Sequence, residues 1–253
     1  LKMIKTEFRV GLKMKKFYFL ISFILCLFLA ACSKKESEIA TEQNAQVSAD
    51  EKLGTKWGDE VTSHVTEVNL KRLSDQPIAE SQVRYANKQY QGKTVNSISL
   101  AAGKISFSIV DDADAVLPLF REGQSYYLAG QDGQSYQLKY ENHTDSTFEV
   151  VASVDGIDVL DGSTASRTNS GYVLHPHSEM KIEGFRKSDS AVASFTFSKP
   201  EDAYAANSNN GLIQNTGIIG TVIYQLETPD SKDEINDSSK YAPPPKAFPA
   251  DNN

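Results

Sequence analysis

The sequence predicts an all-β protein with a single antiparallel β-sandwich domain between two disordered ends. Apolar and polar residues alternate with a period of two through the middle of the chain, as where polar residues separate Ile105, Phe107 and Ile109. Such alternation is typical of antiparallel strands with one buried face. Apolar residues at helical spacing are scarce, and Asp-Gly pairs that favour tight turns stand between strand patterns. Together these observations favour a sandwich.

The chain begins with a segment that has the layout of a secretion signal. Lys15 and Lys16 precede an uncharged apolar stretch that runs from Phe17 to Leu29. The run 17–31 is shorter than the roughly 20 residues that a membrane-spanning helix needs, so a signal that is removed is favoured over a permanent span. Met14, directly before the lysines, is the expected initiator. Residues 1–31 are therefore interpreted as a signal peptide.

The run Leu29-Ala30-Ala31-Cys32 resembles the lipobox of bacterial lipoproteins. This resemblance implies cleavage before Cys32 and attachment of lipid, such as palmitate, at Cys32. Two or three acyl chains hold a protein on a membrane for practical purposes permanently. Ser33 stands where an aspartate would signal retention in the inner membrane, so the resemblance favours the outer membrane, facing the periplasm or the cell surface. A plain secretory signal beside a cysteine is the alternative.

Cysteine content and charge exclude several classes of function. The second cysteine, Cys26, lies in the segment expected to be removed, so no disulfide, cysteine nucleophile or thiolate metal site is expected. Six of the 26 basic residues and one of the 33 acidic residues fall in 1–31, which leaves a formal charge of −12 on the remainder. This charge repels nucleic acid and anionic lipid, so neither is expected as a partner.

Polar composition predicts a flexible segment on each side of the domain. Residues 32–53 contain almost no large apolar side chain and cannot offset their ordering entropy, so we interpret them as a tether. Residues 227–253 hold five of the nine prolines and are expected to be a disordered tail with a short polyproline-II piece. The segment between them, 54–226, is long enough for one domain with a substantial core.

Strands are expected wherever alternation or β-branched and aromatic residues are bounded by turn-forming residues. Along the chain these ranges are 61–70, 94–100, 105–109, 125–129, 136–140, 148–154, 157–160, 172–174, 180–185, 195–197 and 217–226. Short helices are expected at 77–90 and 200–206. Asp132-Gly133 lies between two strand patterns and predicts the type I′ turn of a two-residue hairpin.

Three aspartates at every third position, Asp155, Asp158 and Asp161, raise the question of a calcium site, because hard cations take several oxygen ligands. The spacing differs from that of an EF-hand, which requires glutamate at the position where this chain has Ser166. We interpret the aspartates as parts of two Asp-Gly turns around a short strand, with an ion site as the alternative.

His175 and His177 flank Pro176, and an extended backbone would place both imidazoles on one side. Two imidazoles can start a zinc or copper site, for which His64 and His143 are the remaining histidines. An exposed turn is the favoured interpretation, and no metal or cofactor is assigned.

Motifs of enzyme catalysis are missing from the sequence. The serines after Gly123 and Gly133 lack the closing glycine of a nucleophile elbow, and no phosphate-binding loop, dinucleotide fingerprint or zinc-protease motif is present. We therefore expect a non-enzymatic domain. A small hydrolase or metal-binding protein without a recognisable motif is an alternative.

Trp57, between two glycines, and the segment Gly184-Phe185-Arg186 could supply a stacking platform and a charged clamp for a sugar or peptide. The favoured interpretation is that Trp57 caps the core and that Arg186 pairs with a surface acid.

The sequence thus predicts a lipid-anchored cell-envelope protein whose β-sandwich binds another envelope protein or the cell wall through an edge, an end loop or the tail. A carbohydrate- or peptidoglycan-binding module is the alternative, and an exposed aromatic shelf that includes Trp57 would favour it.

Overall fold

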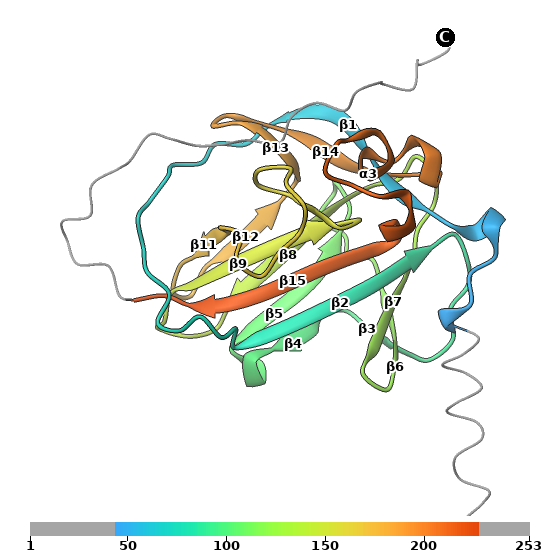
Figure 1. Cartoon of the computed structure of the whole chain (residues 1–253). Helices are drawn as coiled ribbons and strands as arrows, with labels where there is room; N and C mark the ends of the chain where they lie inside the picture. Colours follow the sequence, from blue (N-terminus) through green and yellow to red (C-terminus); the bar gives the residue numbers. More distant parts are fainter. Residues whose placement is uncertain (1–43, 228–253) are drawn as a thin grey trace, which may run out of the picture. The chain divides into compact units, whose positions relative to one another are not determined.

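The computed structural model describes residues 44–227 and confirms the all-β sandwich (Figure 1). Two sheets of seven and eight strands carry the fold. Neighbouring strands run antiparallel, except that β2 (Ala79–Ala86) and β7 (Ser125–Ala129) pair in parallel. None of the helices that the structure describes combines the length and the apolar character of a membrane span.

The first sheet has the order β1-β14-β8-β5-β4. Its central strands β8 and β14 pair over only two residues each, and beyond this short contact β12 continues along β8 while β13 continues along β14. The strands of this sheet are β1 (Gly54–Thr62), β4 (Ile98–Leu100), β5 (Ile105–Val110), β8 (Ser135–Asn142), β12 (Glu179–Ile182), β13 (Gly184–Ser188) and β14 (Ala191–Ser198).

The second sheet has the order β10-β9-β15-β2-β7-β6-β3, with β11 paired beside β9. Besides β2 and β7 it contains β3 (Lys93–Val95), β6 (Leu119–Glu122), β9 (Phe148–Val154), β10 (Ile157–Asp158), β11 (Tyr172–Leu174) and β15 (Ile218–Gln225). The short helices are η1 (Ala49–Glu51), η2 (Ala101–Gly103), η3 (Pro200–Asp202), α3 (Tyr204–Asn207) and η4 (Ile213–Asn215).

The core lies between the two sheets and contains the residues that the two-residue alternation selects. Ile105, Phe107 and Ile109 of β5 are fully buried, while the residues between them are half-buried. They join one apolar cluster with residues of the second sheet such as Val150 and Ile223. The alternation therefore predicted the buried face of this strand correctly.

Three of the expected strand ranges coincide with observed strands: 125–129 with β7, 148–154 with β9 and 172–174 with β11. The helix expected at 200–206 is confirmed as η3 followed by α3. The range 94–100 is divided into β3 and β4, which belong to different sheets.

Two expectations about secondary structure are wrong. The segment 77–90 contains strand β2 instead of a helix, because β15 and β7 pair with its two sides and override the helical propensity of its Ala, Glu, Gln and Arg residues. The strand expected at 61–70 lies earlier, at 54–62, and residues 63–78 form an irregular connection between the two sheets.

The hairpin expected around Asp132-Gly133 is also wrong. The pair does form a turn, and Gly133 has a φ of +84°. However, β7 belongs to the second sheet and β8 to the first, so the turn carries the chain across the sandwich. A two-residue hairpin would require the flanking strands to pair, whereas β7 pairs with β6 and β2.

The compact unit begins at Asn44, so residues 44–53 of the expected tether belong to the domain. The Asn44 side chain donates to the Gln91 carbonyl at 2.8 Å and accepts from the Gln91 N–H at 3.0 Å. Leu53 is 4 % exposed, and Val47 packs on a small cluster with Tyr90 and Tyr127. These contacts hold the segment in spite of its polar composition. The rest of the tether, Cys32 and the tail from residue 228 lie outside the described residues.

Candidate functional site

A cleft of about 670 Å³ lies at the side of the sandwich where, among the described residues, one strand of each sheet has an edge without a partner strand. β11 pairs only with β9, and β12 pairs only with β8, so each strand leaves one edge without a partner strand in the described part of the chain. Residues of both strands line the cleft, and the connection from Ser63 to Val68 forms a further wall. We call this site the edge cleft.

Apolar side chains cover much of the edge cleft. Val68 is 47 % exposed, whereas Tyr172 and Met180 are half-buried and pack against the main core. The apolar residues that line the cleft are Val65, Val68, Leu160, Tyr172, Val173 and Met180. An apolar lining with a few polar groups is the usual composition of a ligand site.

Arg186 of β13 is the charged residue buried most deeply in this cleft, with 3 % of its surface exposed. Its guanidinium donates to the Ser63 carbonyl and, at 3.1 Å, to the Ser63 hydroxyl. Its Nε donates to the Tyr172 hydroxyl at 3.2 Å. These bonds fix the guanidinium between β11 and the connection that begins at Ser63.

The expected ion pair between Arg186 and a surface acid is wrong. Within residues 44–227, no carboxylate oxygen lies within 4.0 Å of the Arg186 guanidinium. Arg72 provides the contrast: its Nε lies 2.5 Å from Glu149 Oε2, and its guanidinium stacks over the Tyr224 ring. A buried charge is normally compensated by an opposite charge. Among the described residues, Arg186 has only neutral hydrogen-bond partners.

Trp57 does not form an exposed aromatic shelf. It is only 9 % exposed, and its ring packs on Tyr204 of α3 with 5.1 Å between the ring centroids. The expectation that Trp57 caps one end of the core is therefore confirmed. Its glycine neighbours fit close packing, because a Cβ on Gly58 would lie 2.4 Å from the Ser194 hydroxyl.

The two histidines beside Pro176 do not share a face as an extended backbone would require, because His177 has a φ of +49°. His177 contacts Asp145 Oδ1 at 2.8 Å, and both histidines are exposed. His175 lines the edge cleft together with His64. In the described residues, no group of three or more His, Cys, Asp or Glu side chains has the arrangement of a metal site.

The three aspartates spaced by three serve as turn and clamp residues. Asp158 Oδ1 accepts hydrogen bonds from the N–H groups of Leu160 and Asp161, and Asp161 Oδ1 accepts one from Ser163. Burial raises the pKa of Asp158 to about 6. Asp155 and Gly156 form the tight turn between β9 and β10, with φ values of +55° and +77°. The two expected Asp-Gly turns are thus present.

Asp155 is the centre of a buried polar network that joins the sheets. Its carboxylate accepts hydrogen bonds from the Tyr85 hydroxyl at 2.6 Å and from the N–H groups of Thr55 and Gly217 at 2.7 and 2.8 Å. The Thr55 hydroxyl in turn contacts the hydroxyls of Tyr85 and Tyr136. Burial raises the pKa of Asp155 to about 7, while the hydrogen bonds from Tyr85 and the backbone act in the opposite direction.

A shifted acid pKa often marks a catalytic group, but the surroundings of Asp155 favour a structural role. Its oxygens are satisfied by donors from both sheets, and the side chain is 1 % exposed. It lines none of the pockets described here. The network therefore acts as a polar clamp within the core.

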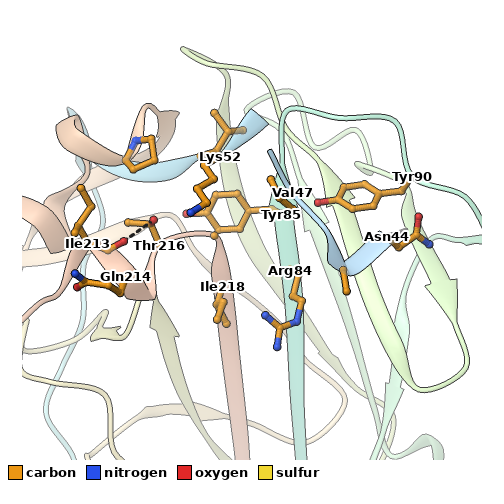
Figure 2. Close-up of a pocket in the computed structure, with 14 residues that line it drawn as sticks. Asn44, Val47, Lys52, Arg84, Tyr85, Tyr90, Ile213, Gln214, Thr216 and Ile218 are labelled. Atoms are coloured by element: carbon orange, nitrogen blue, oxygen red, sulfur yellow. Dashed lines mark hydrogen bonds between the residues drawn. The ribbon is translucent and has the colours of Figure 1, made fainter. Parts of the chain in front are cut away.

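A second pocket, of about 360 Å³, adjoins residues 44–53 (Figure 2). Lys52 and Arg84 contribute exposed cations, and Tyr85, Ile213 and Ile218 contribute apolar surface. Figure 2 shows the Tyr90 hydroxyl directed toward Val47. This hydroxyl is buried without a hydrogen-bond partner among the described residues, and burial raises the pKa of Tyr90. The two cations are exposed, so the lining of this pocket presents no buried charge to a ligand.

The sequence pointed to Arg186 but not to its setting. Ser63 and Tyr172 were not expected to take part in a site, because they lie 123 and 14 residues from Arg186 and no motif links them. The only available signal was an arginine directly after the predicted strand range 180–185, next to a residue expected to be buried.

Comparison with known proteins adds no assignment: no protein-family model, curated protein or solved structure matches this chain.

Proposed function

We propose that this protein is a lipid-anchored component of the bacterial envelope and that its location is the outer membrane. Its β-sandwich is a non-enzymatic module that binds another envelope protein. The edge cleft is the binding site in this proposal. The observation that carries it is the combination of an apolar cleft with a buried guanidinium. Within residues 44–227, the two strand edges beside the cleft have no partner strand, and no carboxylate lies within 4.0 Å of the guanidinium. An extended segment of a partner can add to a free strand edge through main-chain hydrogen bonds.

The alternatives receive less support from the described residues. A sugar-binding module would need an exposed aromatic platform, and Trp57 is buried under α3. A hydrolase would need a nucleophile beside a base in an accessible pocket, and the strongly shifted acid Asp155 is enclosed by hydrogen-bond donors instead.

Site-specific photocrosslinking in intact envelopes tests whether the edge cleft binds another envelope protein. A photoreactive phenylalanine analogue replaces Val68, which lines the edge cleft and is 47 % exposed. The matched control replaces Val116, a valine that is 40 % exposed and does not line the cleft. We expect a light-dependent adduct with an envelope protein at position 68 and none at position 116. Equal adducts at both positions, or none at position 68, would contradict a partner site at the cleft.

The anchor half of the proposal is tested by Cys32→Ala. Because the thiol is the expected point of lipid attachment, this change should abolish labelling by radioactive palmitate and leave an unprocessed precursor. Labelling of the variant, or partition of the wild-type protein into the aqueous phase of a detergent separation, would show that the lipoprotein interpretation is wrong.

A further inference from the structure

The edge cleft presents two kinds of unsatisfied group to a ligand. The first is main-chain: β11 pairs with β9 on one side only, and no described residue forms a main-chain hydrogen bond with its other edge, which lies beside the cleft. The second is the guanidinium of Arg186, whose five N–H donors have three hydrogen bonds within the described residues. A ligand that satisfies both groups carries a peptide backbone and an acceptor for a guanidinium.

The positive charge of Arg186 favours a carboxylate as the acceptor on the ligand. A planar guanidinium binds a carboxylate through two parallel hydrogen bonds, and such charge-assisted bonds are about twice as strong as neutral ones. Arg72 shows that this protein pairs a partly buried arginine with a carboxylate where the chain itself supplies one, in Glu149. For Arg186 the described chain supplies only hydroxyl and carbonyl oxygens. A ligand carboxylate would provide the opposite charge.

The acids around the cleft limit how many negative charges a ligand can carry. Glu67 and Asp161 line the cleft, and the whole chain has a formal charge of −7. Lys181, the other lysine or arginine of the lining, already pairs with Asp114 at 2.9 Å. A segment with several acidic side chains is therefore repelled, whereas a chain end can deliver a single carboxylate to Arg186 and leave apolar side chains along the walls.

We propose that the edge cleft recognises the C-terminal carboxylate of an extended, apolar peptide segment, with Arg186 binding the carboxylate and the free edge of β11 pairing with the peptide backbone. This inference rests on the proposed function, because it names the chemistry of the partner at the same site. Ser63 and Tyr172 act as positioning residues, since their oxygens hold the guanidinium in place.

The test uses the full chain, immobilised in detergent, and three pools of acetylated tetrapeptides with apolar residues at the second and fourth positions. One pool ends in a carboxylate, and the second has the same sequences and ends in a carboxamide. The third ends in a carboxamide and carries glutamate at its third position. We expect at least tenfold greater retention of the carboxylate pool than of either amide pool, measured by mass spectrometry.

Two variants test whether Arg186 causes the preference for the carboxylate pool. Arg186→Gln should reduce the ratio between the carboxylate and carboxamide pools to about one. The matched variant Arg121→Gln, which changes an exposed arginine that does not line the cleft, should keep the ratio. Because Arg186→Gln also removes three internal hydrogen bonds, a second measurement follows the Nε–H resonance of Arg186 in the wild-type protein. This resonance should shift with the carboxylate pool and stay unchanged with the carboxamide pool.

Three results would overturn the inference. Equal retention of the first two pools would remove carboxylate recognition, and stronger retention of the glutamate pool would assign recognition to an acidic side chain. Retention of no pool, combined with a crosslink at position 68, would show that the cleft binds an envelope protein by other chemistry. Absence of that crosslink, with the carboxylate preference intact, would instead contradict the proposed function alone.

Discussion

At the scale of single residues, burial in the folded domain changes the hydrogen bonding and the pKa of Asp155 and Asp158. Asp155 is a turn former by sequence, yet its carboxylate receives hydrogen bonds from residues 100, 70 and 62 positions away. A buried polar group is costly unless it is paired, so the four elements that meet at Asp155 are mutually constrained. The same residue thus closes a hairpin and holds both sheets together.

The raised pKa of Asp155 predicts how stability depends on pH. Between its ordinary value of 3.8 and its folded value of about 7, the native state keeps a proton that the unfolded state has released. This residue's contribution to the free energy of unfolding therefore decreases as pH rises through that window, by up to about 1.4 kcal/mol per pH unit. Asp158, with a pKa of about 6, acts in the same direction.

Urea unfolding between pH 4 and 7.5 tests this prediction, with Asp155→Asn as the matched variant that cannot titrate. The stability of the wild type relative to the variant should decrease across the window. A difference that increases or stays level would contradict protonation of Asp155 in the folded state, and carbon NMR of its carboxyl group gives the same answer without a variant.

At Gly184, the close packing of the backbone predicts that any side chain would destabilise the domain. This glycine lies where the chain passes from β12 to β13, and a Cβ there would be 1.9 Å from the Ala193 carbonyl oxygen. Gly184→Ala should destabilise the domain by about 3 kcal/mol or more, because the clashing atom is backbone of a central strand. Gly123→Ala is the control, since its Cβ would meet nothing within 4 Å and only its φ of +58° costs about 1 kcal/mol. Equal losses in urea unfolding would contradict a steric role for Gly184.

At the scale of elements, strand pairing decides what local sequence leaves ambiguous. The residues of β2 favour a helix, but burial alternates along the strand, and Val83 and Tyr85 face the core. Pairing on both sides then outweighs local propensity. The opposite holds for β7, β9 and β11, whose β-branched and aromatic residues agree with their environment.

The C-terminal tail, residues 228–253, is predicted to add no stability to the domain. Ordering a residue's backbone costs roughly 1–2 kcal/mol, and residues 228–253 offer only isolated apolar side chains such as Ile235, Tyr241 and Phe248 in return. Removal of 228–253 should therefore leave the melting temperature unchanged within error. A decrease of several degrees in a thermal melt would show that the tail packs on the domain.

At the scale of the whole molecule, the domain boundary has a measurable consequence. A fragment of residues 44–227 should give a strand-dominated circular dichroism spectrum and melt cooperatively. A fragment that starts at Gly54 loses the buried Leu53, the packing of Val47 and the paired hydrogen bonds of Asn44. With about 3 kcal/mol lost, its melting temperature should be lower by roughly 6–12 °C. Equal melting temperatures would show that residues 44–53 add no stability.

The sequence by itself determined the fold class, several strands and their buried faces, and two of the Asp-Gly turns, because these follow from local periodicity and backbone preference. It also supplied the expectation of an anchor at Cys32, which stays a prediction. The tertiary structure alone decided which strands pair, where β2 forms and that Asp132-Gly133 crosses between sheets. It alone brought Arg186, Ser63 and Tyr172 together at the edge cleft. These features depend on contacts between residues far apart in the chain, and no local pattern encodes which distant partner a strand or a buried charge will meet.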